Sequence, residues 1–259
     1  MNQKAKDLGL SNTNFVTPHG LDNDEHYTTP YELAILTDYA LNNKTFREIV
    51  NTQFYTISIN EYTKELKNTN ELLGNLNGVN GVKTGFTNKA GRCLVTSTMR
   101  NNWEIICVVL GADTKKTRTK DSINLIEYTF KNYKLINIKK LIQEKFENEI
   151  QSYKDLIQIK DGKTKTLNLI LNEIGAELYP IRINEEGDLK CNIDMVNYIK
   201  APIKKGDILG SLEITSGENI IYNVDILVDN DILEKDLFDY FKLFLFNIGT
   251  YICNGRILE

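Results

Sequence analysis

The sequence predicts an α+β fold, and three observations support this prediction. The first is a pair of apolar, β-branched runs, 92–99 and 103–111, that a short polar turn joins into a hairpin and that helical patterns flank. The second is a change after residue 135 to short β-prone runs separated by turns, which is typical of a small all-β domain. The third is an amphipathic pattern in the tail from 231 to 251.

From these patterns we expect three parts in chain order. Residues 1–134 form an antiparallel sheet with helices, residues 135–230 form a small all-β domain, and residues 231–259 form an amphipathic helix. A chain of 259 residues is long enough to bury more than one core. The net charge of -4 and the interspersed acids and bases give no basic surface, so we expect no nucleic-acid partner.

The first elements have clear local signals. Met1, Ala5 and Leu8 share one helix face that Gly9 would end, but no capping residue precedes them. We therefore expect this short helix to be the last two turns of a longer one whose beginning is absent from the chain. A second helix begins at Thr29-Pro30, where the threonine can cap, the proline fits the first turn, and Glu32 can close a capping box.

The rest of the first domain follows from periodicity. Residues 54–60 alternate like a strand, residues 68–80 are rich in Asn and Gly and predict a loop, and residues 117–130 have the spacing of a helix. The tail is too short and too charged to span a bilayer. It is suited either to an interfacial position or to packing on the β domain.

The most informative motif is Lys-Thr-Gly at 83–85, placed just before the predicted hairpin. The tripeptide alone occurs by chance in roughly one chain in twenty of this length. A longer match surrounds it, in order and spacing. With that match, which continues to about residue 130, the chain resembles the D-alanyl-D-alanine carboxypeptidases of the low-molecular-mass penicillin-binding proteins. The matching stretches are Met1-Asn2-Gln3-Lys4-Ala5, Leu8-Gly9-Leu10, Thr13-Asn14-Phe15, Pro18-His19-Gly20-Leu21-Asp22, His26-Tyr27-Thr28-Thr29, Asn68-Thr69-Asn70-Glu71-Leu72-Leu73 and Gly81-Val82-Lys83-Thr84-Gly85.

The resemblance implies a function and a set of substrate-binding residues. It implies a hydrolase that removes the terminal D-alanine from peptidoglycan stem pentapeptides through a serine acyl-enzyme, that β-lactams inhibit, and that needs no metal or other cofactor. Lys83 would supply charge for the terminal carboxylate of the substrate and Thr84 a hydroxyl hydrogen bond. Gly85 would leave room for the substrate backbone, and the backbone N–H of Thr87 would contribute to the oxyanion hole.

Two family signatures are missing from the chain. No Ser-x-x-Lys occurs, and the two Ser-x-Asn matches, at Ser58 and Ser122, lie downstream of the place that the family gives this motif. We therefore expect a truncated β-lactamase/transpeptidase-like domain that has no catalytic residue of its own and is not active alone. Two alternatives stay open, a non-catalytic wall-binding remnant and a β-lactamase, and the C-terminal β domain speaks against the second.

The remaining expectations concern location and other candidate residues. No signal peptide is visible, yet the family implies the outer face of the cytoplasmic membrane, with the tail as a peripheral membrane contact. A zinc site at His19 and His26 lacks acidic or Cys partners at ligand spacing. Arg118, a conceivable second anion contact, has the pattern of a surface residue.

Overall fold

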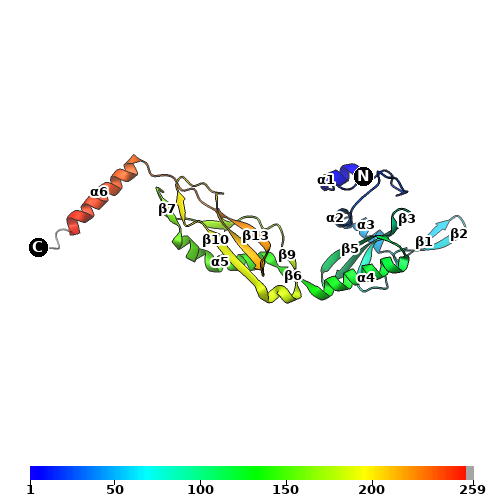
Figure 1. The fold of residues 1–259 in the computed structure, drawn as a ribbon. Coiled ribbons are helices and arrows are strands. Elements are labelled where there is room, and N and C mark those ends of the chain that lie inside the picture. Colours follow the sequence, from blue (N-terminus) through cyan, green and yellow to red (C-terminus); the bar gives the residue numbers. More distant parts are fainter. Residues whose placement is uncertain (255–259) are drawn as a thin grey trace. The chain divides into compact units, whose positions relative to one another are not determined.

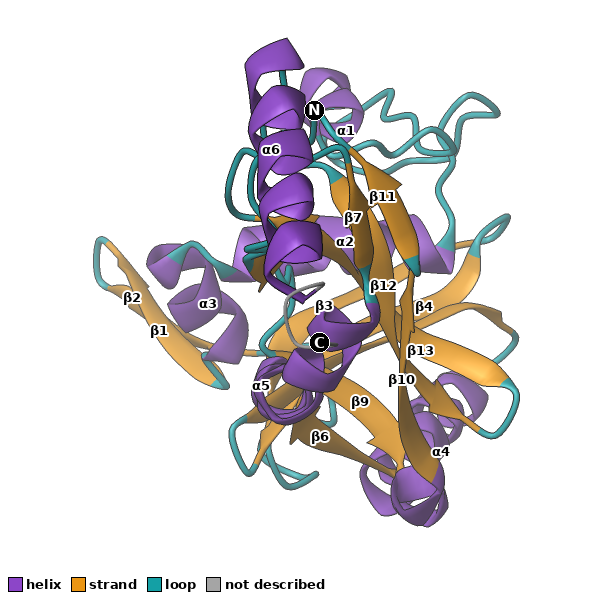
Figure 2. Ribbon diagram, turned by 90° about the vertical axis from the view of Figure 1, so that its left-hand side faces the viewer, coloured by secondary structure: helices purple, strands orange, loops and turns teal. Residues whose placement is uncertain are grey.

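The computed structural model describes residues 1–254, and the surroundings of side chains as far as Phe246 (Figure 1). The chain divides into two compact units, Met1–Asn132 and Tyr133–Glu259. Each unit mixes helices with antiparallel strands, so the predicted α+β class is confirmed. Helices and strands are distinguished by colour in Figure 2.

The first unit is built on a three-stranded antiparallel sheet in the order β3-β4-β5. A separate hairpin, β1-β2, precedes it along the chain. In chain order the elements are α1 (Asn2–Asp7), α2 (Pro30–Leu41), α3 (Lys44–Asn51), β1 (Phe54–Ile59), β2 (Tyr62–Lys67), β3 (Val79–Thr87), β4 (Gly91–Arg100), β5 (Trp103–Ala112) and α4 (Lys115–Asn132).

Helices cover both faces of this sheet. On one face Leu94 of β4 and Cys107 of β5 pack against Ile126 of α4. On the other face Val95 of β4 packs with Leu41 of α2 and with α3. The sheet therefore has a small core on each side, and β3 lies at its edge.

The hairpin predicted from the two apolar runs is confirmed. Strands β4 and β5 pair antiparallel with Arg100 opposite Trp103. Asn101 and Asn102 between them both have positive φ, 50° and 61°, the backbone conformation of the two-residue turn that suits the right-handed twist of a hairpin. The predicted helix at 117–130 is also confirmed, within the longer α4.

The start of α2 confirms the cap but not the capping box. Thr29 accepts a hydrogen bond from the Glu32 backbone N–H, and Pro30 occupies the first turn. Glu32 does not reach back to Thr29. Its buried carboxylate instead accepts hydrogen bonds from the backbone N–H of Asn12, at 2.8 Å, and from the Thr13 hydroxyl. The prediction of a box was wrong because a tertiary contact 20 residues away takes the carboxylate.

The second unit is β-rich and has one core. Its main sheet has the order β10-β12-β13-β8, and helix α5 packs against it through Ile138 and Ile142 (Figures 1 and 2). The sequence prediction of an all-β domain did not include α5. The elements are β6 (Tyr133–Asn137), α5 (Ile138–Leu156), β7 (Gln158–Lys160), β8 (Leu169–Leu171), β9 (Leu178–Arg182), the 3-10 helix η1 (Ile183–Asp188), β10 (Leu189–Met195), β11 (Tyr198–Lys200), β12 (Ile208–Ser216), β13 (Asn219–Val228) and α6 (Leu237–Asn254).

Helix α6 is joined to the β-rich part through its first turn. Lys163 pairs with Asp236 at 2.8 Å and with Asp239 at 3.0 Å, and the Tyr240 hydroxyl donates to Asp161 at 2.7 Å. Large apolar side chains on the following turns are exposed. Of the helices in residues 1–254, none has the length and apolar character that crossing a membrane requires. The predicted tail runs to 259, and residues 255–259 lie outside the described part.

Candidate functional site

The predicted ligand-binding tripeptide lies on the edge strand of the first sheet. One side of β3 pairs with β4, with Lys83 opposite Val95, Thr84 opposite Leu94 and Gly85 opposite Cys93. No strand in residues 1–254 pairs with its other side. Unpaired main-chain groups at such an edge can bind an extended peptide as an added strand.

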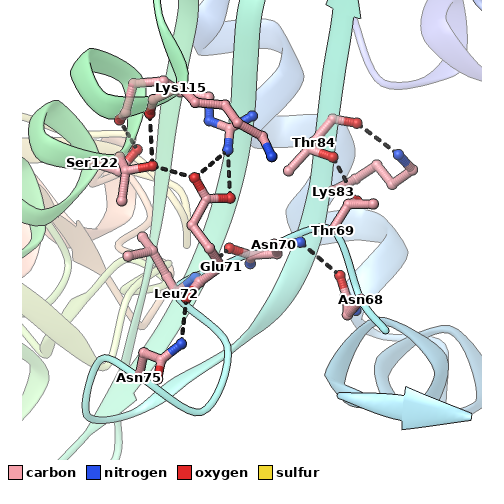
Figure 3. A network of polar contacts seen from close by, with 12 residues as sticks. Asn68, Thr69, Asn70, Glu71, Leu72, Asn75, Lys83, Thr84, Lys115 and Ser122 are labelled. Carbon is pink, nitrogen blue, oxygen red and sulfur yellow. Dashed lines mark hydrogen bonds and ion pairs between the residues drawn. The ribbon is translucent and has the colours of Figure 1, made fainter. Parts of the chain in front are cut away.

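Lys83 and Thr84 present polar groups near this edge, as Figure 3 shows. The Lys83 side chain is exposed, and its ammonium group donates to the carbonyl oxygen of Thr84 at 2.6 Å. The Thr84 hydroxyl lies 2.7 Å from the Thr69 hydroxyl, so one donates to the other. Lys83 has no carboxylate partner among the described residues. An exposed cation and a hydroxyl group are therefore available to an incoming anion.

A short segment, Asn68 to Glu71, is hydrogen-bonded to β3 and places Thr69 in the site. The side-chain amide of Asn70 donates to the Gly81 carbonyl oxygen at 2.8 Å and accepts from the Leu72 N–H at 3.1 Å. Asn70 is only 2% exposed, so these bonds replace water and fix the segment. Thr69 was not predicted as a site residue, although it lies inside the stretch that carries the family resemblance.

An ion pair between a buried arginine and a partly exposed glutamate joins the same segment to helix α4. The carboxylate of Glu71, which Figure 3 labels, accepts hydrogen bonds. The donors are Arg118 Nη2, at 2.5 and 2.6 Å, and the Thr119 hydroxyl. Burial opposes ionisation of Glu71, but the hydrogen bonds from Thr119 and Arg118 outweigh it and hold the pKa of the carboxyl below its ordinary value. Arg118 is 2% exposed, so the prediction of a surface arginine was wrong. Its charge is neutralised within the fold.

Gly85 is not required by the fold of β3. Its φ is not positive, and a Cβ placed there would touch only the Cβ of Cys93, at the ordinary contact distance of 3.6 Å. Gly78, at the start of the same strand region, is different: its φ is 81° and a Cβ would lie 2.3 Å from the Met99 carbonyl oxygen. Glycine at 85 is thus free to serve ligand binding, whereas glycine at 78 serves the backbone.

Thr87 ends β3 and starts the turn into β4. Its hydroxyl accepts from the Ala90 N–H at 3.0 Å, which fixes the turn. Lys89 on this turn pairs with Asp24 at 2.7 Å. The role of the Thr87 backbone N–H in an oxyanion hole stays a prediction.

The other sequence candidates lie elsewhere. Ser122 is fully buried in α4 and donates to the Arg118 carbonyl oxygen at 2.9 Å, while Ser58 is exposed on β1. His19 and His26 each accept a backbone N–H through Nδ1, from Leu21 and Val16. Among the described residues no group of three or more His, Cys, Asp or Glu side chains is placed to hold a metal ion.

Comparison with known proteins assigns both units. Residues 1–114 match the model of the D-alanyl-D-alanine carboxypeptidase family, and residues 148–234 match the C-terminal domain of penicillin-binding protein 5. An α+β domain with Lys-Thr-Gly on its edge strand, followed by this β-rich domain, defines the class of penicillin-binding carboxypeptidases. The chain belongs to the D-alanyl-D-alanine carboxypeptidase family.

Individual relatives show how much of such a protein the chain represents. It is 31% identical over 250 residues to D-alanyl-D-alanine carboxypeptidase DacF of Bacillus subtilis, covering 93% of this chain and 60% of DacF. It is 27% identical over 252 residues to DacA of Escherichia coli, covering 94% and 58%. The chain thus spans about 60% of the length of these curated relatives.

Solved structures give the same fold. Penicillin-binding protein 5 of Haemophilus influenzae superposes with a TM-score of 0.66 at 25% identity, over 90% of this chain and 64% of that one. The D-alanyl-D-alanine carboxypeptidase DacD of Francisella tularensis gives 0.65 at 21% identity, over 90% and 67%.

Proposed function

We propose that this chain forms the carboxylate-binding part of a serine-type D-Ala-D-Ala carboxypeptidase, a hydrolase that trims peptidoglycan stem pentapeptides in cell-wall synthesis and the maintenance of cell shape. The observation that carries the proposal is the unpaired edge of β3, where exposed Lys83 and the Thr84 hydroxyl stand beside a glycine that the fold does not require. Membership of the carboxypeptidase family supports it.

In this reaction the strand binds and orients the substrate. The terminal carboxylate takes the charge of Lys83 and the hydroxyl of Thr84, and the peptide backbone lies along β3 past Gly85. A serine then attacks the carbonyl between the two D-alanines, the amine of the last D-alanine leaves with a proton, and water cleaves the ester. The Thr87 N–H would stabilise the oxyanion. The 259 residues contain no Ser-x-x-Lys, so the proposal requires a serine from residues outside this sequence.

The missing Ser-x-x-Lys also favours a second candidate, a protein that binds wall peptides without cleaving them. The two candidates differ in covalent chemistry, because β-lactams acylate the serine of a penicillin-binding enzyme. Fluorescent penicillin applied to the protein in its native cells would label the enzyme at its full length. A binding protein would take up no label yet still bind D-Ala-D-Ala.

We place the protein at the outer face of the cytoplasmic membrane, with α6 as a peripheral membrane contact. The support is the face of α6 that carries Leu237, Phe238, Phe241, Phe244 and Leu245, which are between 52% and 89% exposed. These residues follow one another at helical spacing, and aromatic side chains on such a face suit the boundary between headgroups and acyl chains.

The ligand-binding claim is tested by titrating the chain with Nα-acetyl-D-Ala-D-Ala and following the backbone amide signals by NMR. We expect shifts centred on β3, no binding of the L,L isomer, and about tenfold weaker binding in Lys83→Gln, since a charge-assisted hydrogen bond contributes about 1.5 kcal/mol. Lys64→Gln, at a lysine on β2 that is also exposed, is the matched control and should bind like the wild type. Equal affinity in the wild type and Lys83→Gln would contradict the proposal.

A further inference from the structure

The small parallel sheet of β7 and β11 in the second unit has an apolar face and a polar face (Figure 2). Its two strands pair with Ile159 opposite Ile199 and with Lys160 opposite Lys200. Both isoleucines pack in the core of the unit, and Ile199 is only 8% exposed. Because side chains alternate along a strand, Lys160 and Lys200 lie together on the other face, where both are exposed.

The two lysines form a pair of like charges. Neighbouring strands lie about 4.8 Å apart, so the side chains of register partners start close to each other. Like charges placed directly opposite one another destabilise a sheet. In the described part of the chain no carboxylate forms an ion pair with Lys160 or Lys200. The sheet therefore contains an unfavourable contact that a bound anion would relieve.

The acidic side chains close to this pair along the chain have other partners. Asp161, the residue after β7, accepts a hydrogen bond from the Tyr240 hydroxyl at 2.7 Å. Asp236 and Asp239 both pair with Lys163. These carboxylates hold the start of α6 and form no ion pair with the lysines of β7 and β11.

The same contacts place the lysine pair beside the start of α6. The backbone N–H of Lys235 donates to the Asp161 carbonyl oxygen at 2.7 Å, so the chain that enters α6 lies against the residue that follows Lys160. The exposed apolar face of α6 begins two residues later, at Leu237. Tyr198, two positions before Lys200 on the same face of β11, is 52% exposed. Cations beside exposed apolar and aromatic side chains suit the surface of an anionic bilayer.

We infer that Lys160 and Lys200 form a binding site for the phosphate headgroups of anionic phospholipids, beside the apolar face of α6. The inference rests on the proposed function, in which α6 contacts the membrane. A phosphodiester supplies the negative charge and the acceptor oxygens that two neighbouring ammonium groups need. Stable membrane anchoring generally takes two signals, of which an apolar segment is one and basic residues at an anionic surface are another. The lysine pair thereby makes membrane binding depend on anionic lipid.

The test measures co-sedimentation of the chain with two kinds of vesicle, one of pure phosphatidylcholine and one of equal parts phosphatidylcholine and phosphatidylglycerol. We expect the wild type to bind the mixed vesicles more tightly. A chain with both Lys160→Gln and Lys200→Gln should bind the mixed vesicles about ten- to thirtyfold more weakly and should bind pure phosphatidylcholine as the wild type does. A chain with Lys160→Arg and Lys200→Arg keeps both charges and should bind both kinds like the wild type.

The matched control carries Lys139→Gln and Lys190→Gln. These two lysines are exposed and have no carboxylate partner in the described part of the chain. They lie near the starts of α5 and β10, whereas β7 and β11 follow the ends of those elements. The control loses the same net charge from the same unit and should bind like the wild type. An equal loss in the control would show a general effect of net charge and would overturn the inference.

The outcomes separate this inference from the proposed function. If Phe241→Glu with Phe244→Glu abolishes vesicle binding and the paired glutamine variant binds mixed vesicles like the wild type, the lysine site is overturned and the membrane contact of α6 stands. If the wild type binds neither kind of vesicle, both are overturned, and the dipeptide titration decides the ligand-binding claim independently. Should the paired variant lose its dispersed amide signals, the single variants decide: wild-type binding in both Lys160→Gln and Lys200→Gln overturns the inference, and a several-fold loss in either supports it.

Discussion

Glu71 joins the segment that carries Thr69 to helix α4 through Arg118. Arg118 is 2% exposed and its Nε has no hydrogen-bond partner in the described part of the chain, so its charge depends on Glu71. A buried charge that loses its partner is strongly destabilising, and the cost is smaller when the partner is partly in water. The Glu71 side chain is 35% exposed.

We therefore expect Glu71→Gln to lower the free energy of unfolding by about 1–3 kcal/mol at pH 7, measured by urea denaturation. The pKa of Glu71 is lowered in the folded state, so its contribution is complete above the ordinary value of 4.5 and is lost as pH falls through the lower folded pKa. The difference between wild type and variant should shrink over that interval. Glu127→Gln, which breaks the more exposed pair with Arg100, is the control, with an expected loss below about 1 kcal/mol. Equal losses in the two variants would contradict this account.

At the residue scale, the sequence predicts which residues have a functional or capping role, but it does not predict which distant residues they contact. Lys83 and Thr84 were found from their motif, and Thr29 from the chemistry of helix caps. The Thr69 to Thr84 contact joins residues 15 positions apart, and the burial of Arg118 depends on Glu71, 47 positions away. Neither pairing has a local signal, because both depend on how α4 and the segment before β3 pack together.

At the scale of the element, Gly85 in strand β3 and Gly78 just before the strand have different roles. Gly85→Ala should leave the free energy of unfolding within about 0.5 kcal/mol of wild type, since the added Cβ has room. It should weaken binding of Nα-acetyl-D-Ala-D-Ala several-fold, about 1 kcal/mol, because the methyl group stands where the ligand backbone approaches.

Gly78→Ala is the matched control for that substitution. Its φ of 81° and the 2.3 Å approach to the Met99 carbonyl predict a loss of stability above about 1 kcal/mol. Chemical denaturation and the NMR titration together separate the two glycines. A Gly85→Ala variant that is destabilised as much as Gly78→Ala, or that binds the dipeptide like wild type, would show that glycine at 85 serves the backbone.

Elements with strong local signals were predicted and those without them were not. The hairpin of β4 and β5 follows from two β-branched runs and an Asn-Asn turn. Strand β2 was assigned to no element because its side chains are exposed on both faces, which leaves no apolar alternation to detect. Helix α5 is absent from the sequence prediction because its buried residues, Ile138, Ile142 and Ile150, lie in a stretch that the prediction assigns to an all-β domain.

At the scale of the whole molecule, we propose that the first unit binds the ligand and that α6 contacts the membrane. A doubly substituted chain, Phe241→Glu and Phe244→Glu, should lose most of its co-sedimentation with phosphatidylglycerol and phosphatidylcholine vesicles, since it places two charges on the apolar face. Tyr62→Glu, at an 85% exposed aromatic side chain on β2, should sediment like wild type. If the doubly substituted chain still binds the vesicles, the proposed membrane contact of α6 is contradicted.

The central claim is that the edge of β3 binds the terminal carboxylate of a D-Ala-D-Ala peptide. The most direct measurement is a crystal structure of the chain with Nα-acetyl-D-Ala-D-Ala. The account predicts carboxylate oxygens within hydrogen-bond distance of Lys83 Nζ and Thr84 Oγ1, with the peptide extended along β3 past Gly85. A peptide bound elsewhere, or bound at β3 with its carboxylate turned away from both residues, would contradict it.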